Sequence, residues 1–265
     1  MNTLDFHNHL MPSVDDGAQS LEESCRGLSA FQAEGVNAVI TTPHFDASLT
    51  LWPELLSERL ARLDAAWTEV SHHARSHHPG LLLERGVELM LDIPHPELAD
   101  RRLRLAGGPF VLIEFPYMTV PPRSAETIST LLGGGTLPIL AHPERYDGFT
   151  RDFSLAEQWK RAGAYFQVNG GSLLGRYGPE AQRFAYGLIE RGWADYLCSD
   201  YHARGVLGVR AYQELLTSAD AEEHVHLLCE VNPRRVLAGE PPLPVPALAT
   251  KRTFWGRVSG LFSAR

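Results

Sequence analysis

The sequence has few cysteines, no long apolar run and no excess of positive charge. Three cysteines, widely spaced among 265 residues, do not suggest a disulfide framework and favour a reducing compartment. No apolar stretch reaches the roughly 18 residues that a membrane span requires. The net charge of −8 argues against nucleic acid as a partner, because phosphate backbones bind basic surfaces. The opening segment, MNTLDFHNHL, has neither the basic nor the apolar region of a signal peptide, so we expect a cytoplasmic protein.

Short apolar runs alternate with helix-like segments along the chain. The hydrophobic content of 44% is ordinary for a globular protein. We predict strands at 3–7, 36–42, 81–89, 109–115, 136–142, 164–169 and 194–199. We predict helices at 20–35, 53–75, 123–132, 154–163, 178–191 and 208–217. Ser20 is the expected N-cap of the first helix, and Pro53 suits the first turn of the second. This order is typical of a parallel α/β barrel or a doubly wound sheet.

Polar side chains recur at the carboxyl ends of these predicted strands. In an α/β barrel such ends converge on one face, where active sites are built. Six of the seven predicted strands carry a histidine or an acid there, and Asp15 and Asp16 lie in the loop after the first strand. The strand-end residues are His7, His9, His44, Glu88, Glu114, His142, Asp200 and His202.

This set offers nitrogen and oxygen ligands and no thiolate. It therefore favours Mn²⁺, Fe²⁺ or Zn²⁺ over soft-metal sites. Eight or nine ligands are too many for one ion, so the sequence predicts a cluster of two or three metals bridged by carboxylates. Such a cluster activates water and holds a phosphoryl group that is being transferred.

The stretch CSDYHARG, residues 198–205, allows two interpretations. Cys198 and Arg204 have the Cys-x5-Arg spacing of a cysteine-dependent phosphatase, whereas Asp200 and His202 form a metal-ligand pair. A phosphate loop needs backbone N–H groups and positive charge to lower the thiol pKa, and Asp200 would repel the phosphate. The same spacing also occurs by chance in CEVNPRR, residues 229–235. We therefore interpret Cys198 as a core strand residue.

Several motifs resemble those of the polymerase-and-histidinol-phosphatase (PHP) superfamily. In chain order they are DFHNHLMPSVDDGAQSLEES, TTPH, GVEL, LIEFP, AHPERY, NGGSLLGRYG and SDYH. The resemblance is closest to the bacterial manganese-dependent protein-tyrosine phosphatases of the CpsB/YwqE type and covers residues 4 to about 240. It implies a distorted TIM-like (β/α)7 barrel (the PHP fold), formed by residues 1–240.

The resemblance also implies a trinuclear metal centre, occupied by Mn²⁺ or alternatively by Fe²⁺ or Zn²⁺. One metal would be held by His7, His9, Glu88 and Asp200. A second would be held by Glu88, Glu114 and His142, with Glu88 as the bridge. Asp16, His44 and His202 would lie near the third.

Substrate contacts follow from the same motifs. Arg145 matches a family arginine that binds the substrate phosphate as a bidentate clamp. The second such arginine is Arg204 or Arg210, and the sequence leaves the choice open because YHARG departs from the usual pattern after this motif. Asn169 opens NGGSLLGRYG, whose glycines permit either close approach to a ligand or a turn. His202 or a bound water would supply a proton to the leaving group.

The predicted activity is hydrolysis of phosphotyrosine on a bacterial tyrosine kinase that controls capsule or exopolysaccharide synthesis. A metal-activated hydroxide would attack phosphorus in line. One alternative is a small-molecule phosphatase for histidinol phosphate or a sugar phosphate. Another is a catalytically inactive regulator that binds the kinase.

The last 25 residues, 241–265, are predicted to form a Pro-rich linker and a basic amphipathic tail. Apolar residues in 251–265 recur at helical spacing, which is typical of a helix that binds the membrane surface. In that interpretation the segment would bring the protein to the inner face of the cell membrane. Packing against the barrel, or disorder, is the alternative that we favour for it.

Overall fold

The computed structural model describes residues 2–147 and 152–248, within which every strand pairing is parallel. One sheet has the order β1-β2-β4 and the other has the order β3-β5-β6-β7-β8-β9. The strands are β1 (Thr3–Asp5), β2 (Val36–Thr41), β3 (His44–Asp46), β4 (Leu82–Arg85), β5 (Glu88–Met90), β6 (Phe110–Glu114), β7 (Leu137–Ala141), β8 (Tyr165–Asn169) and β9 (Tyr196–Cys198). The prediction of an α/β fold with parallel strands is thus confirmed.

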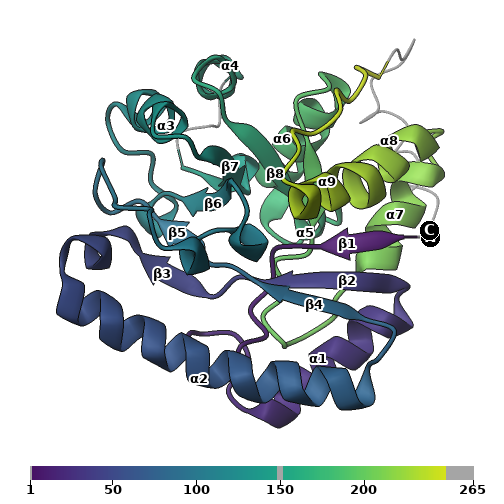
Figure 1. Ribbon diagram of the computed structural model, residues 1–265. Coiled ribbons are helices and arrows are strands. Elements are labelled where there is room, and N and C mark those ends of the chain that lie inside the picture. Colours follow the sequence, from purple (N-terminus) through teal and green to yellow (C-terminus); the bar gives the residue numbers. More distant parts are fainter. Residues whose placement is uncertain (1, 148–151, 249–265) are drawn as a thin grey trace.

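Helices cover the outer faces of both sheets (Figure 1). Helices α1 and α2 pack beside β2 and β4, whereas α3 packs against β7 and α4 against α3. The α-helices are α1 (Leu21–Ala33), α2 (Pro53–His77), α3 (Ser124–Gly133), α4 (Ser154–Arg161), α5 (Gly170–Leu173), α6 (Gly178–Glu190), α7 (Val209–Thr217), α8 (Glu222–His226) and α9 (Asn232–Ala238). A π-helical turn, Leu227–Val231, joins α8 to α9.

Local signals place the first two helices as predicted. The Ser20 side chain accepts a hydrogen bond from the Glu23 backbone N–H, which confirms the N-cap of α1. The Glu23 carboxylate accepts from the Gln19 N–H instead of closing a capping box on Ser20 itself. Pro53 is the first residue of α2, where its missing N–H costs no helical hydrogen bond.

The single strand predicted at 81–89 is wrong, because the chain changes sheet in its middle. Residues 82–85 form β4 and residues 88–90 form β5, in different sheets. Gly86 lies at the break, and a Cβ there would come within 2.9 Å of the Leu105 side chain. The Gly86 N–H donates to the Thr41 carbonyl, and the Glu88 N–H donates to the Pro43 carbonyl. After this change of sheet, β5 begins at Glu88.

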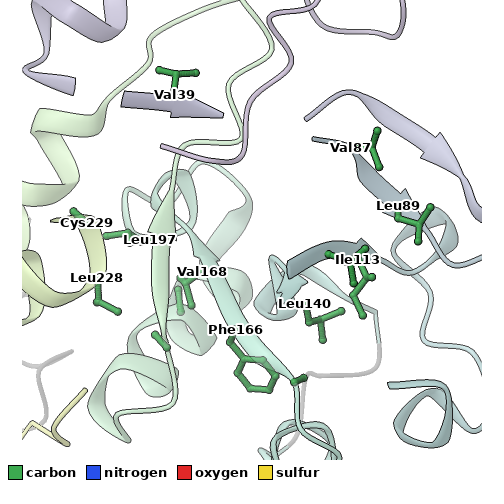
Figure 2. Close-up of a cluster of buried hydrophobic side chains, with 14 of the residues drawn as sticks. Val39, Val87, Leu89, Ile113, Leu140, Phe166, Val168, Leu197, Leu228 and Cys229 are labelled. Carbon is green, nitrogen blue, oxygen red and sulfur yellow. The ribbon is translucent and has the colours of Figure 1, made fainter. Parts of the chain in front are cut away.

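Two faces of the strands build two apolar clusters. The outer faces, drawn in Figure 2, contribute side chains such as Val39, Leu140 and Phe166 to a large cluster beneath the helices. The opposite faces contribute to a smaller cluster that includes Phe6, Ile40, Leu112, Ile139 and Cys198. Side chains from both sheets therefore meet on this inner side.

The Pro-rich segment packs against the helices. Over 241–248 it has no helix or strand, and it is held by Asn232, which exchanges two hydrogen bonds with the Leu243 backbone. His224 Nε2 lies 2.8 Å from the Pro246 carbonyl. The predicted amphipathic tail, 251–265, lies outside the described residues. Within 2–147 and 152–248, the helices lack the combination of length and hydrophobicity needed to cross a bilayer.

Candidate metal centre

The side chains predicted at the strand ends lie together. His7 and His9 follow β1, Glu114 ends β6 and His142 follows β7. The others come from the loop after β1, the starts of β3 and β5, and the segment after β9: Asp16, His44, Glu88, Asp200 and His202. All nine belong to four overlapping groups whose nitrogen and oxygen atoms lie within 4.8 Å of one another. We refer to these nine residues as the His–carboxylate cluster.

Glu88 lies at the middle of this cluster and is fully buried. Its Oε1 is 3.1 Å from His7 Nε2 and 3.0 Å from His142 Nε2. Its Oε2 is 3.1 Å from His44 Nδ1 and 3.5 Å from His9 Nε2. One carboxylate thus faces four imidazoles, an arrangement in which it can serve two cations at once.

Asp200 connects the buried histidines to two further polar side chains. Its Oδ1 lies 3.3 Å from His7 Nε2 and 3.4 Å from His9 Nε2. Its Oδ2 accepts hydrogen bonds from Arg145 Nη1 at 2.6 Å and from Asn169 Nδ2 at 2.9 Å. One oxygen therefore faces the cluster, and the other orients two of the predicted substrate-binding residues.

The outer side of the cluster is open to solvent. His44 Nδ1 lies 3.0 Å from Glu114 Oε1, and His44 Nε2 lies 3.5 Å from Asp16 Oδ1. The same Asp16 oxygen is 3.3 Å from His202 Nε2. The Asp16 side chain is 65% exposed, so the cluster runs from the protein interior to a surface that a substrate can reach.

Hydrogen bonds outside the cluster orient its imidazoles. His7 Nδ1 lies 2.7 Å from Gln167 Oε1, and His9 Nδ1 lies 2.8 Å from Asp15 Oδ2. With Nδ1–H donating to these oxygens, each Nε2 carries a lone pair that faces the cluster. Such outer hydrogen bonds fix the tautomer of metal-binding histidines and raise their basicity.

Neither Gln167 nor Asp15 is among the sequence-predicted site residues. The two-residue alternation of a strand could have identified Gln167. This residue lies two positions before Asn169 on β8, so both side chains are on the same face of the strand. Asp15 is adjacent to Asp16, and its carboxylate also accepts from the Gly17 and His44 N–H groups. Sequence alone does not tell which of the two aspartates faces the cluster.

The electrostatics of the cluster are strongly negative. Burial opposes a charge on His7, yet Glu88 and Asp200 raise its pKa to about 10. Burial likewise opposes a charge on His44, but the Glu114 and Glu88 carboxylates beside it raise its pKa to about 12. Burial disfavours the Glu88 carboxylate, but the surrounding histidines hold its pKa well below the usual value. The site therefore favours positive charge, which metal cations supply.

Unpartnered buried atoms provide a direct test of whether metals fit. His7 Nε2, His9 Nε2 and Glu88 Oε2 are buried, and although ionic neighbours lie 3.1–3.5 Å away, none of the three has a partner in hydrogen-bond geometry. Leaving such atoms unpaired in the interior costs about 1–3 kcal/mol each. All three converge on the same space, and their donor chemistry is that of Mn²⁺, Fe²⁺ and Zn²⁺ sites. The residues present fit a metal centre.

Backbone strain is concentrated at two members of the cluster. His142 (φ 34°) and Asp200 (φ 53°) adopt left-handed conformations, which cost a non-glycine residue about 1–3 kcal/mol. The Asp200 N–H bonds to the His7 carbonyl, and the His142 N–H bonds to the Gln167 carbonyl. These bonds hold the strained turns that direct both side chains inward.

The predicted substrate-binding arginines occupy different places. The Arg145 guanidinium lies on the Tyr177 ring, 4.1 Å from its centroid, beside Asp200. Arg204 is exposed at the rim, with its Nη2 3.9 Å from Asp16 Oδ2. Arg210 is directed away, because its Nη2 donates to the Ala33 carbonyl at the end of α1. The structure brings Arg145 and Arg204 to the cluster and leaves Arg210 out.

The position of Cys198 agrees with the interpretation of it as a core residue. Its side chain is fully buried in the inner apolar cluster. Burial raises the pKa of its thiol well above the usual value, whereas a nucleophilic cysteine requires a lowered one.

Comparison with known proteins gives a consistent result. The family model described as capsular polysaccharide synthesis, CpsB/CapC, matches residues 3–238. Tyrosine-protein phosphatase YwqE of Bacillus subtilis (strain 168) is 28% identical over 207 residues, 75% of this chain and 77% of YwqE. Tyrosine-protein phosphatase CpsB of Streptococcus pneumoniae is 25% identical over 244 residues, 88% of this chain and 98% of CpsB.

The fold is also shared with a solved structure. A chain from the crystal structures of YwqE from Bacillus subtilis and CpsB from Streptococcus pneumoniae, described as metal-dependent tyrosine phosphatases, superposes with a TM-score of 0.77. The sequence identity is 24%, and the match covers 94% of this chain and 100% of that one. With the family match over nearly its whole length, the chain belongs to the CpsB/CapC family of capsular polysaccharide synthesis.

Proposed function

We propose that this protein is a metal-dependent protein-tyrosine phosphatase. The observation that carries the proposal is the His–carboxylate cluster, in which buried nitrogen and oxygen atoms from several parallel strands and the segments after them converge on one space. The names of its relatives YwqE and CpsB as tyrosine-protein phosphatases support the substrate class.

The nine residues are proposed as ligands of two or three ions, with Mn²⁺ as the metal. His7, His9, Glu88 and Asp200 would hold one ion, and Glu88, Glu114 and His142 a second. Asp16, His44 and His202 would hold the third; the contact of Asp16 with both histidines supports this group. When bound, such ions lower the pKa of a water and neutralise charge on a phosphoryl group.

The chain's own residues have distinct proposed roles around that centre. Arg145, half-buried on Tyr177 and beside Asp200, would donate two N–H groups to phosphate oxygens. Asn169 fixes the Asp200 carboxylate and can donate to the same phosphate. A water at the edge of the cluster would deliver a proton to the leaving phenolate; half-buried His202 would do so only where it does not hold the third ion.

We further propose that the two sheets close into a distorted (β/α)7 barrel, formed by residues 1–240. Hydrogen bonds from Asp200 N–H to the His7 carbonyl and from His9 N–H to the Tyr201 carbonyl join the segments after β1 and β9. The inner apolar cluster contains side chains from both sheets, as a barrel interior would.

The proposed substrate is a phosphotyrosine-bearing bacterial tyrosine kinase of capsule or exopolysaccharide synthesis. Membership of the CpsB/CapC family supports this choice. The proposed location is the cytoplasm, at the inner face of the membrane where such a kinase would be met. Contact of residues 251–265 with that membrane is part of the proposal.

The test is hydrolysis of a phosphotyrosyl peptide by metal-stripped protein with Mn²⁺ added back, beside histidinol phosphate. We expect Mn²⁺-dependent hydrolysis of the peptide, and its loss in His142→Ala. Faster turnover of histidinol phosphate would instead identify a small-molecule phosphatase. Binding of the kinase without hydrolysis of either substrate would identify an inactive regulator.

A further inference from the structure

An open cavity of about 500 Å³ lies beside the His–carboxylate cluster. Its wall includes Asp200 and His202 of the cluster, together with Tyr177 and Val206. Val206 is 71% exposed and Tyr177 40%, so the cavity leads from the cluster to the surface. The part of a substrate that extends beyond the reacting phosphate can lie here.

The same wall carries two guanidinium groups. Arg176 donates from Nη1 to the Val206 and Leu207 carbonyls, and within residues 2–147 and 152–248 no ion pair joins it to a carboxylate. Arg204 donates from Nη2 to the Asp16 backbone carbonyl, and the same nitrogen lies 3.9 Å from the Asp16 carboxylate; its other N–H groups have no protein acceptor among the described residues. Both side chains therefore keep N–H groups available to a ligand.

The cavity offers these arginines little negative charge of its own. Among its described lining residues, Asp200 is the single carboxylate, and Arg145 already pairs with it at 2.6 Å. Arginines on the outer helices differ: Arg26 pairs with Glu22 at 2.6 Å, and Arg161 pairs with Glu157 at 2.6 Å. In a chain of net charge −8, the cavity wall thus carries two guanidinium groups and one carboxylate, which Arg145 already pairs.

We propose that this cavity recognises a second anionic side chain of the substrate, next to the phosphotyrosine. The inference rests on the proposed function and names its substrate class: phosphotyrosyl peptides with an acidic or phosphorylated neighbour. Guanidinium groups suit this task because they donate paired N–H groups to carboxylate and phosphate oxygens. The phosphotyrosine phosphate lies at the cluster, and Arg176 and Arg204 bind the neighbouring group.

The experiment compares kcat/KM for four phosphotyrosyl peptides that differ only in the neighbouring residue: glutamate, glutamine, lysine or a second phosphotyrosine. Exposed ion pairs each contribute up to about five-fold, so we expect the glutamate peptide to exceed the glutamine peptide by about ten-fold. The lysine peptide should be the slowest. If kcat/KM for the doubly phosphorylated peptide exceeds that for the glutamate peptide, the favoured neighbour is a phosphate. If the two values are equal, any anion serves. The preference should shrink as salt is raised, because screening weakens exposed pairs.

Charge reversal assigns the preference to the cavity. Arg176→Glu and Arg204→Glu should each reduce it several-fold, and the double variant should favour the lysine peptide. Arg75→Glu, at the exposed carboxyl end of α2, makes the same change of net charge away from the cavity. This control should keep the wild-type preference.

Three outcomes would overturn the inference while the proposed function stands. The first is equal rates for all four peptides with the wild-type protein. The second is a preference that survives both charge reversals. The third is a fall in kcat/KM of the charge-reversed variants that is as large for an aryl phosphate without a peptide as for the glutamate peptide. The arginines would then act on the reacting phosphate itself. Failure of the wild type to hydrolyse any of the peptides with Mn²⁺ would instead refute the proposed function, and the inference with it.

Discussion

Replacing Glu88 by glutamine should remove most of the stabilisation that Mn²⁺ gives to the fold. The substitution keeps the size of the side chain but removes the charge that faces four imidazoles at 3.0–3.5 Å. A ligand that binds only the folded state at 100 times its Kd adds about 2.7 kcal/mol to the free energy of unfolding. For a domain of this size that raises Tm by about 5–11 °C.

The variant should lose nearly all of this shift. Loss of a residue that merely supports a metal ligand weakens binding by about 10–100-fold, and loss of a central ligand should cost at least the upper value. At the same Mn²⁺ concentration the remaining stabilisation is then about 0.4 kcal/mol, or about 1–2 °C in Tm. Thermal unfolding with chelator and with added Mn²⁺ measures both shifts.

A matched control separates this effect from a general change of charge. Glu69→Gln alters an exposed glutamate in the middle of α2 and should keep the full Mn²⁺ shift. If Glu88→Gln also keeps the full shift, the reasoning that places Glu88 at the centre of the metal site is refuted.

Three further outcomes follow from the geometry. Cys198→Ser should retain its phosphatase rate and its sensitivity to chelators, because the thiol is buried and its pKa is raised well above the usual value. If the wild type instead resists chelators and Cys198→Ser is inactive, the metal interpretation is wrong. Gln167→Leu should raise the Kd for Mn²⁺ by about 10–100-fold, measured by calorimetry, because His7 Nδ1 loses its partner at 2.7 Å; an unchanged Kd would deny the hydrogen bond a role. Gly170→Ala should lower the free energy of unfolding by about 1–3 kcal/mol, because a Cβ there would lie 2.1 Å from the Tyr212 ring; an unchanged denaturant midpoint would contradict this packing.

The sequence predicted the location of the cluster better than its details. Alternation of apolar runs and helices places residues such as His142 and Glu114 at strand ends, and parallel strands must bring those ends to one edge. Because that argument uses only the period of each element, it does not depend on loop conformation. It therefore gathered eight of the nine side chains without giving any distance between them, although His44 and Glu88 begin strands instead of ending them. Asp16, in a loop, is assigned by the family resemblance.

Tertiary contacts decided what the sequence could not. The strand β3 has three residues, His44–Asp46, and no apolar run that would predict it. The break at Gly86 depends on the close approach of Leu105, which is distant in the sequence. The direction of Arg210 depends on the carbonyl of Ala33 at the end of α1. Each of these is set by a neighbour that local patterns do not contain.

Anomalous diffraction at the manganese edge, on crystals grown with Mn²⁺, tests the central claim most directly. The account predicts two or three manganese peaks among the nine side chains, with one peak on each side of the Glu88 carboxylate. Peaks elsewhere, or no peak in protein that hydrolyses phosphotyrosyl peptides, would contradict it.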